Sequence, residues 1–332
     1  MAAASLNSTL STPINFSPNV EHLLSEEEYR IYDTLLAVIL SLCTLVGILG
    51  NLLCLTYFSS ANKRDSSLIY TIVSTVDICT CVVHFPVMMA LYNARQPGLF
   101  GNMTFCVTWI ILFNYLQVMS MFLVMLLSVS RTISFIFLHY KIKKQCLIVA
   151  FLAYTSFYIV WYIIAHVFAT SDKLYRYNEF SVYCFRGLYT KPLSYIAQLI
   201  RAILIGIPPI LTTISFVLGS YKLLQKSLVT CTDKRKYQAA VTIAMFTAVF
   251  LVCNLPCLLN NIMWFITKLL YEYPGPIYSH PFMAYYSWVI SDVICTVLNA
   301  AFNPVLYVYR MSQLREWVSA KVFQRTQNRR SS

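Results

Sequence analysis

Charged residues are scarce in this chain: Asp, Glu, Lys and Arg make up only 11% of its 332 residues. Soluble globular domains carry about 25% of these residues. Glycine is also rare, with 8 residues, so the chain lacks the regular turn signals that a soluble core of this size needs. These shortages, together with 58% hydrophobic residues, argue against a soluble domain and indicate a membrane protein.

The chain consists instead of long apolar segments that short charged segments separate. Each apolar segment exceeds the roughly 20 residues that a helix needs to cross a bilayer core. Helices are the default spanning structure because they satisfy all their backbone groups internally. The sequence therefore predicts an all-α membrane protein, a bundle of seven transmembrane helices, in the segments 35–58, 67–92, 103–138, 146–170, 193–221, 239–267 and 281–309.

Basic side chains gather in alternate connecting segments and in the C-terminal tail. The N-terminal segment is acidic, and Arg30 is its only Lys or Arg. Because Lys and Arg in short loops mark the cytoplasmic side, the sequence predicts a multi-pass plasma-membrane protein with an extracellular N-terminus and a cytoplasmic C-terminus. The net charge of +12 is then a topology signal, and no nucleic-acid partner is expected.

The segments assigned to the outside hold candidate modification sites. Asn7 and Asn15 begin glycan acceptor tripeptides. Of the 11 cysteines, only Cys106 and Cys184 lie at outward positions, where the oxidising environment makes a disulfide the natural pairing. The first 30 residues lack the apolar core of a signal peptide, so the first span is expected to act as its own insertion signal.

Several motifs recur along the spans in a fixed order. Each is weak alone, but in register the set resembles a rhodopsin-like G protein-coupled receptor over about residues 33 to 323. The residues that carry this resemblance are Gly50-Asn51, Asp77, Cys106, Arg131, Trp161, Pro208-Pro209, Phe250, Cys253-Asn254-Leu255-Pro256 and Asn303-Pro304-Val305-Leu306-Tyr307.

The resemblance implies a receptor, not an enzyme. Such a receptor binds an extracellular ligand within the bundle and activates heterotrimeric G proteins, with arrestin as a further partner. It would comprise a glycosylated tail at 1–32, the helical domain at 33–310, and an amphipathic helix and cytoplasmic tail at 311–332. That helix places Leu314, Trp317 and Val318 on one apolar stripe beside basic residues, which is typical of a helix lying on membrane lipids; a disordered basic tail is the alternative.

Some family positions differ here and mark a divergent member. Ser130 stands where the family has an acid before Arg131, and Thr132 where it has a tyrosine. Asn254 replaces the family's tryptophan two residues before Pro256. The resting ion pair on Arg131 is therefore expected to be missing, which raises the expected basal activity.

The resemblance also implies two roles for matched residues inside the bundle, G-protein coupling and sodium binding. Arg131 would contact the G protein, with Phe250, Pro256, Pro304 and Tyr307 taking part in activation; an arginine snorkelling to the interface is the alternative for Arg131. Asp77 would hold an allosteric sodium ion, since oxygen ligands suit a hard cation. A protonated Asp77 in a hydrogen-bond network is the alternative. The expected polar network comprises Asp77, Ser120, Asn254, Asn299 and Asn303.

The ligand pocket that the family places in the bundle would be rich in amides and aromatics, although helix packing would equally explain most of the aromatics. Arg201 could anchor a carboxylate or phosphate, or pair internally with Asp292, or snorkel outward. Phe113 replaces the acid of amine receptors, and the last span has no lysine for retinal. The candidate residues are His84, Phe113, Asn114, Gln117, Gln198, Arg201, Asn261, Trp264, Tyr285, Trp288 and Asp292.

Within the aromatic segment 172–191, the alternation around Tyr177–Phe185 predicts a short hairpin. By analogy with peptide receptors, a peptide is the first expected ligand, and a small anionic or chemosensory ligand the second. A transporter or channel with Asp77 and Arg201 lining a polar pathway is the alternative function. The sequence shows no internal repeat of the kind many transporters have. An intramembrane protease using Asp77 and Asp292 would need a glycine-rich loop, which Ser291-Asp292-Val293 lacks.

Overall fold

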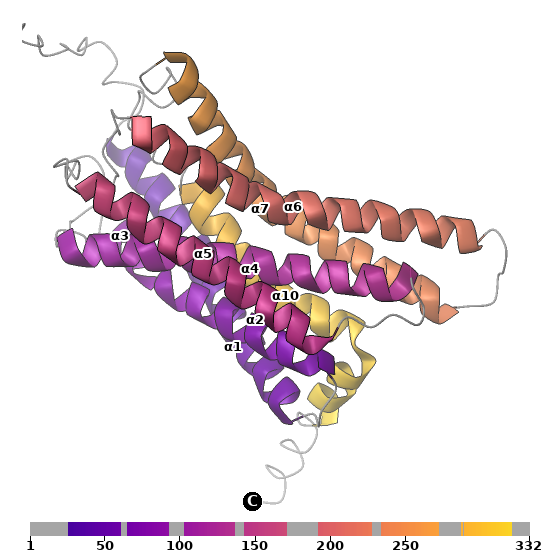
Figure 1. Ribbon diagram of the computed structural model, residues 1–332. Coiled ribbons are helices and arrows are strands. Elements are labelled where there is room, and N and C mark those ends of the chain that lie inside the picture. The colour runs from indigo at the N-terminus through magenta and orange to yellow at the C-terminus, as the bar shows by residue number, and fades with distance from the viewer. Residues whose placement is uncertain are drawn as a thin grey trace, which may run out of the picture.

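The computed structural model describes residues 26–60, 65–92, 103–136, 143–170, 192–227, 234–271, 287 and 289–320. Its helices run alongside one another in one elongated bundle (Figure 1). They are α1 (Glu26–Ser60), α2 (Asp65–Val83), α3 (Phe85–Tyr92), α4 (Met103–Ile136), α5 (Lys144–Thr170), α6 (Pro192–Ser227), α7 (Lys234–Tyr271), the π-helix η3 (Val289–Ile294) and α10 (Cys295–Arg310). A last helix covers 312–320.

The predicted all-α class is confirmed for the described residues, and the predicted number of spans in part. Five helical segments are long and apolar enough to cross a membrane: Arg30–Ser60, Leu68–Met89, Ile111–Ser130, Ala202–Lys222 and Val289–Tyr309. Within α5 and α7 the apolar segments found among the described residues are shorter, Gln145–Trp161 and Thr247–Met263. The count of seven spans therefore stays a prediction for these two helices.

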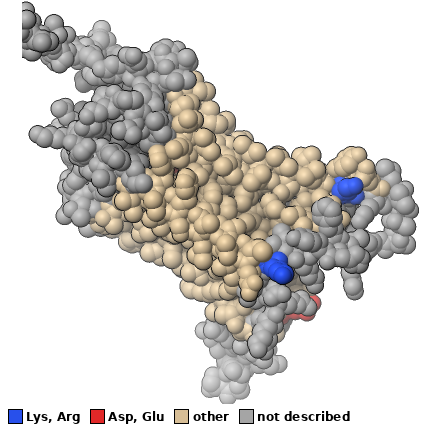
Figure 2. Space-filling model, in the orientation of Figure 1, with Lys and Arg blue, Asp and Glu red and all other residues tan. Residues whose placement is uncertain are grey.

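The surface of the bundle is apolar and its interior is partly polar, the reverse of a soluble protein. Large exposed side chains such as Leu42, Leu49 and Val252 face outward, while Asp77, Asn254 and Asn299 are buried. On the face drawn in Figure 2, the described charged side chains lie toward one end and leave a broad uncharged middle. This distribution suits a bundle surrounded by lipid.

The predicted single helix over 67–92 is broken at His84, which forms a turn between α2 and α3. Pro86 follows two residues later and cannot donate a backbone hydrogen bond. Val87 N donates to His84 O at 3.1 Å, which leaves Val83 O without its usual helical donor. The indole nitrogen of Trp109 on α4 donates to Val83 O at 2.7 Å, so a side chain of a neighbouring helix closes the break.

Two further prolines leave helix carbonyls without donors, and side chains from other helices supply them. Pro304 in α10 frees the carbonyl of Ala300, four residues earlier, and Asn51 Nδ2 on α1 donates to it at 2.9 Å. Pro208 in α6 frees Leu204 O in the same way, and Tyr154 Oη on α5 donates to it at 2.6 Å. Each kink is thereby stabilised by an interhelical hydrogen bond.

Helix α1 approaches α10 closely because glycine stands at the contact. A Cβ atom added to Gly50 would lie 2.6 Å from Pro304 Cγ, and one added to Gly47 would lie 2.6 Å from Cys81 Sγ on α2. Small residues let helix backbones pack closely in membranes. This contact holds α1, α2 and α10 together beside the polar interior.

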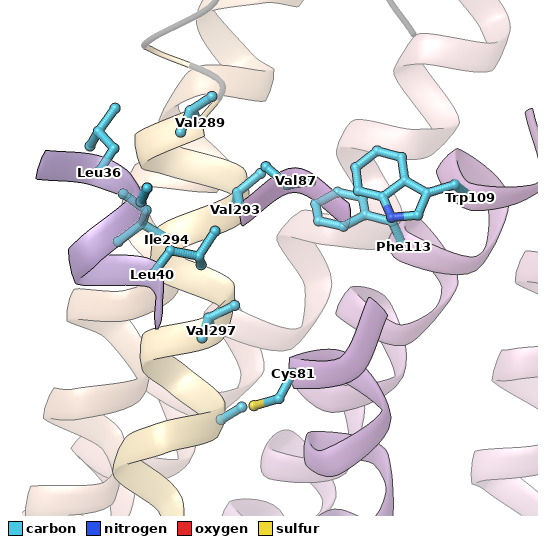
Figure 3. Packing of buried hydrophobic residues seen from close by; sticks show 12 residues of the cluster. Leu36, Leu40, Cys81, Val87, Trp109, Phe113, Val289, Val293, Ile294 and Val297 are labelled. Carbon is cyan, nitrogen blue, oxygen red and sulfur yellow. The ribbon is translucent and has the colours of Figure 1, made fainter. Parts of the chain in front are cut away.

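The two ends of the bundle differ. We call the end that holds α3 the α3 end, and the end that holds helix 312–320 the C-terminal end. At the α3 end, apolar side chains from α1, α2, α3, α4, η3 and α10 form one buried cluster, with Val87, Val293, Trp109 and Phe113 converging between the helices (Figure 3). At the C-terminal end, the buried cluster is mainly aromatic and includes Phe58, Tyr70, Tyr307 and Leu314.

Candidate functional site

A buried carboxylate lies at the centre of the bundle. Asp77 on α2 has no exposed surface. Ser120 Oγ on α4 donates to its Oδ1 at 3.1 Å, and Asn303 Nδ2 on α10 donates to its Oδ2 at 2.7 Å. Three helices therefore meet at one side chain, and both of its oxygens accept hydrogen bonds.

The network extends from Ser120 to a fourth helix. Asn299 Nδ2 on α10 donates to Ser120 Oγ at 3.2 Å, and Asn254 Nδ2 on α7 lies 3.4 Å from Asn299 Oδ1. We call Asp77, Ser120, Asn254, Asn299 and Asn303 the Asp77 layer. The structure brings together all five residues that the sequence grouped, and joins α2, α4, α7 and α10 through them.

The oxygen atoms of the Asp77 layer fit a hard cation. Asp77 offers a carboxylate, Ser120 a hydroxyl oxygen and Asn299 an amide oxygen, which are ligand types that hard cations prefer. Asn303 presents its N–H₂ group to Asp77 and keeps its amide oxygen for other partners. Hydrogen bonds donated to both oxygens of Asp77 are also the arrangement that an ionised carboxylate accepts.

A second polar layer lies one helical turn away. Gln117 Nε2 on α4 donates to Thr296 Oγ1 on α10 at 2.9 Å and to Cys257 Sγ on α7 at 3.2 Å. We call Gln117, Cys257 and Thr296 the Gln117 layer. Its members precede or follow Ser120, Asn254 and Asn299 by three residues, the spacing of neighbours on one helix face. The two layers are thus stacked along α4, α7 and α10.

The carboxylate of Asp292 lies just beyond the Gln117 layer, within η3, and is 2% exposed. Thr296 Oγ1 donates to the backbone oxygen of Asp292. Asn260 Nδ2 on α7 lies 3.4 Å from Asp292 Oδ2, and Ser287 Oγ donates to Asn260 Oδ1 at 2.9 Å. Short π-helical segments often occur at functional sites, which makes this second buried acid a notable feature of the α3 end.

His84 adds a buried polar side chain at the break between α2 and α3. Its Nδ1 lies 2.5 Å from Thr80 O, and its ring lies edge-on to Phe113 on α4 with 5.0 Å between the centroids. Phe113 in turn stacks on Trp109 at 5.3 Å. His84 therefore packs on the face of α4 that carries Phe113 and, four residues later, Gln117.

The remaining ligand candidates are brought together only in part. Asn114 is buried on α4, and Asn261 Nδ2 donates to Cys257 O in its own helix at 2.8 Å. The other candidates have side chains that lie outside the described residues: Gln198, Arg201, Trp264, Tyr285 and Trp288. The pairing of Arg201 with Asp292 and the hairpin around Tyr177–Phe185 consequently remain predictions.

At the C-terminal end, Tyr307 is 1% exposed and packs against rings from two other helices. Its ring centroid lies 5.1 Å from that of Tyr70 and 6.0 Å from that of Phe58. Tyr57 on α1 contacts Trp317 of helix 312–320 at 5.5 Å, and Leu314 is fully buried. The apolar stripe of this last helix therefore anchors it to α1 and α10.

The segment around Arg131 is helical to Ile136, but the side chain of Arg131 lies outside the described residues. Its two neighbours are held by hydroxyl groups. Ser130 Oγ donates to Leu127 O at 3.0 Å, and Thr132 Oγ1 donates to Ser215 O on α6 at 3.2 Å. Thr132, which replaces the family's tyrosine, thus ties α4 to α6.

The other activation residues occupy the kinked helices. Phe250 is fully buried against α4 and α6 residues, and Pro256 lies within α7. The modification sites Asn7, Asn15 and Cys184 fall outside the described residues; Cys106 belongs to α4, but its side chain is not among them. The predicted glycans and disulfide accordingly stay predictions.

Sequence reasoning missed several residues of the polar interior. Cys257, Asn260 and Thr296 all contact residues that were predicted. The spacing of three residues from Asn254 to Cys257 and from Asn299 to Thr296 was a usable signal. Tyr154 carried none, because its partner is a backbone carbonyl on another helix.

A comparison with solved structures identifies the fold. The crystal structure of squid rhodopsin matches with a TM-score of 0.63 and 13% sequence identity, over 90% of this chain and 86% of that chain. No protein-family model and no curated protein matches the chain. The chain thus has the fold of a rhodopsin-like G protein-coupled receptor, and at this identity the likeness concerns the fold.

Proposed function

We propose that this chain is a G protein-coupled receptor of the plasma membrane, with the α3 end outside the cell and the C-terminal end in the cytoplasm. It binds an extracellular ligand, a peptide or a small molecule, at the α3 end of the bundle and activates heterotrimeric G proteins. Arrestin is a second expected cytoplasmic partner.

The Asp77 layer carries this proposal. Its hydrogen bonds connect α2, α4, α7 and α10 in the middle of a rhodopsin-like bundle, so a shift of one helix changes the contacts of the others. Asn303 belongs to this layer, and Tyr307, one turn further along α10, packs in the cluster at the C-terminal end. A change at the α3 end could thus reach the cytoplasmic end through side chains that contact one another.

Direct evidence for the function would come from nucleotide exchange on a purified heterotrimeric G protein. The full chain is reconstituted in lipid nanodiscs, and binding of a labelled GTP analogue is followed with and without the receptor. We expect exchange above that of the G protein alone even without ligand, since Ser130 supplies no acid to restrain Arg131.

Two variants make that experiment specific. Arg131→Ala should abolish the receptor-dependent exchange, and Ser130→Asp should lower the ligand-free rate by restoring an acid partner. Thr213→Val is the matched control, because the hydrogen bond that its hydroxyl makes among the described residues stays within α6, where it donates to Pro209 O. Exchange that is the same with and without the receptor for every G-protein class would contradict the proposal.

The proposed sodium ion is tested separately. If Asp77 holds sodium, replacing sodium chloride with choline chloride should lower the melting temperature of the wild-type protein. Asp77→Asn should abolish that difference, since the amide carries no charge to attract the ion. A wild-type protein that melts at the same temperature in both salts would favour Asp77 acting through hydrogen bonds alone.

A further inference from the structure

Two buried acceptor atoms at the α3 end have no hydrogen-bond donor among the described residues: His84 Nε2 and Gln117 Oε1. Both side chains are 1% exposed. A buried polar atom without a partner typically destabilises the fold by about 1–3 kcal/mol, and native structures hold few of them. Two such atoms in one part of the bundle therefore call for an explanation.

The hydrogen bonds already made fix both atoms as acceptors. His84 Nδ1 faces a backbone carbonyl, which can only accept, so Nδ1 carries a proton, and in the neutral ring Nε2 then carries a lone pair. The Thr296 hydroxyl donates to Asp292 O, so it can only accept from Gln117. The amide N–H₂ group of Gln117 must then face Thr296 and Cys257, which leaves its oxygen as an acceptor.

The two acceptors border the same part of the interior. The ring of His84 contacts Phe113, and Gln117 follows Phe113 by four residues on the same face of α4. His84 reaches α4 from the junction of α2 and α3, and Gln117 reaches from α4 to α10. His84 thus packs against α4 one turn from Gln117, whose side chain extends from α4 to α7 and α10.

The described side chains of this region combine acceptor atoms with apolar surfaces. Asp292 places a buried carboxylate next to Thr296, one member of the Gln117 layer. Toward the α3 end, Val87, Val293 and Phe113 converge, and Trp109 stacks on Phe113 (Figure 3). The lone pairs of His84 Nε2 and Gln117 Oε1 therefore lie beside an apolar layer, which favours a group rich in N–H donors on an apolar body and disfavours an anion.

We propose that the ligand of this receptor inserts a flat apolar end that carries N–H donors, such as an amidine, guanidine or amide. Those donors bind His84 Nε2 and Gln117 Oε1 after the contact between Val87, Val293 and Phe113 has opened. This proposal rests on the receptor function proposed above and names its ligand class. It is opposite to the anionic class that Arg201 suggested from the sequence.

The sharpest test compares two probes of the same shape and opposite chemistry. Benzamidine presents N–H donors on a benzene ring, and benzoate presents only acceptors. Binding of each to the purified full chain in nanodiscs is measured by saturation-transfer NMR, with benzamide as a neutral donor. We expect benzamidine to bind at least about tenfold more tightly than benzoate, since one charge-assisted hydrogen bond contributes that much or more.

Variants locate the binding. His84→Phe keeps the ring contact with Phe113 and removes the acceptor, and Gln117→Leu removes the other; each should weaken benzamidine binding about tenfold. Thr213→Val should bind benzamidine like the wild type. If Gln117→Leu does not fold, His84→Phe alone decides the question.

Equal binding of benzamidine and benzoate, including no binding of either, would overturn the proposal, as would benzamidine binding that both variants retain. The second result would mean that water or a rearranged side chain serves the two acceptors. Because these measurements need no G protein, they can fail while receptor-stimulated nucleotide exchange is present. Failure of exchange with successful probe binding would instead contradict the receptor function.

Discussion

The Asp77 layer and the Gln117 layer are stacked on the same three helices, yet their hydrogen bonding differs. In the Asp77 layer, both carboxylate oxygens and the hydroxyl of Ser120 have partners. In the Gln117 layer, Gln117 Oε1 has no donor among the described residues, and neither has the neighbouring His84 Nε2. These atoms of the Asp77 layer are therefore all hydrogen-bonded, whereas the Gln117 layer has an acceptor atom to which no described residue donates.

The difference also separates stability from function. Complete buried networks fix one packing arrangement, while groups that destabilise the resting fold are often kept because function needs them. We therefore expect the loss of a donor in the Asp77 layer to destabilise the protein, and the loss of the unpaired acceptor of His84, beside the Gln117 layer, to stabilise it. Four substitutions test this contrast, in order of decreasing expected effect.

Replacing Asn303 with leucine should cause the largest loss of stability. The substitution removes the donor to Asp77 Oδ2 and leaves a fully buried carboxylate oxygen unpaired. We expect the free energy of unfolding to fall by about 3 kcal/mol. The melting temperature of the purified protein, followed with a dye that reacts with buried cysteines as they become exposed, measures this; a value equal to that of Thr213→Val would refute the structural role of the layer.

Replacing Tyr154 with phenylalanine provides a reference outside both layers. Its hydroxyl donates to the Leu204 carbonyl that Pro208 leaves free, and its ring stacks on Phe122 at 3.9 Å, a contact that phenylalanine preserves. The loss should be about 2 kcal/mol, that of one unpaired carbonyl. The double variant Tyr154→Phe with Pro208→Ala restores a backbone donor to Leu204 O and should recover part of the melting temperature.

Replacing His84 with phenylalanine should stabilise the protein. The variant removes an acceptor that has no donor among the described residues and preserves an aromatic contact with Phe113. It also removes the hydrogen bond from Nδ1 to Thr80 O, which limits the gain. An increase of about 1 kcal/mol in the free energy of unfolding is expected, visible as a higher melting temperature. A lower melting temperature would show that Nε2 is already satisfied in the resting protein.

Replacing Cys257 with serine should have the smallest effect. Gln117 Nε2 donates to the cysteine sulfur at 3.2 Å, and a hydroxyl oxygen is the stronger acceptor. The free energy of unfolding should change by no more than about 1 kcal/mol. The C–O bond of serine is shorter than the C–S bond of cysteine, so the better acceptor lies farther from Gln117 Nε2. Melting curves of this variant and of Cys253→Ser, which lies one turn earlier in α7 and outside both layers, separate the hydrogen-bond effect from that of polarity alone.

The membrane character and the members of the Asp77 layer could be predicted from the sequence. Scarce charge, long apolar segments and polar residues at matching positions of several spans are local signals, and the family resemblance aligned Asp77 with Ser120, Asn299 and Asn303. The break at His84 and the hydrogen bond of the Tyr154 hydroxyl could not be predicted. Each depends on a helix carbonyl that is left without its backbone donor near a proline, and on a side-chain donor from a different helix.

The sequence by itself determined that the chain forms apolar helices and which polar residues lie within them, because hydrophobicity and helix periodicity are properties of neighbouring residues. Only the tertiary structure decided which of those polar atoms find partners. Whether Gln117 Oε1 or Asp77 Oδ2 meets a donor depends on the rotation and spacing of helices far apart in the chain. That geometry distinguishes the Asp77 layer, which stabilises the bundle, from the Gln117 layer, which we propose contacts the ligand.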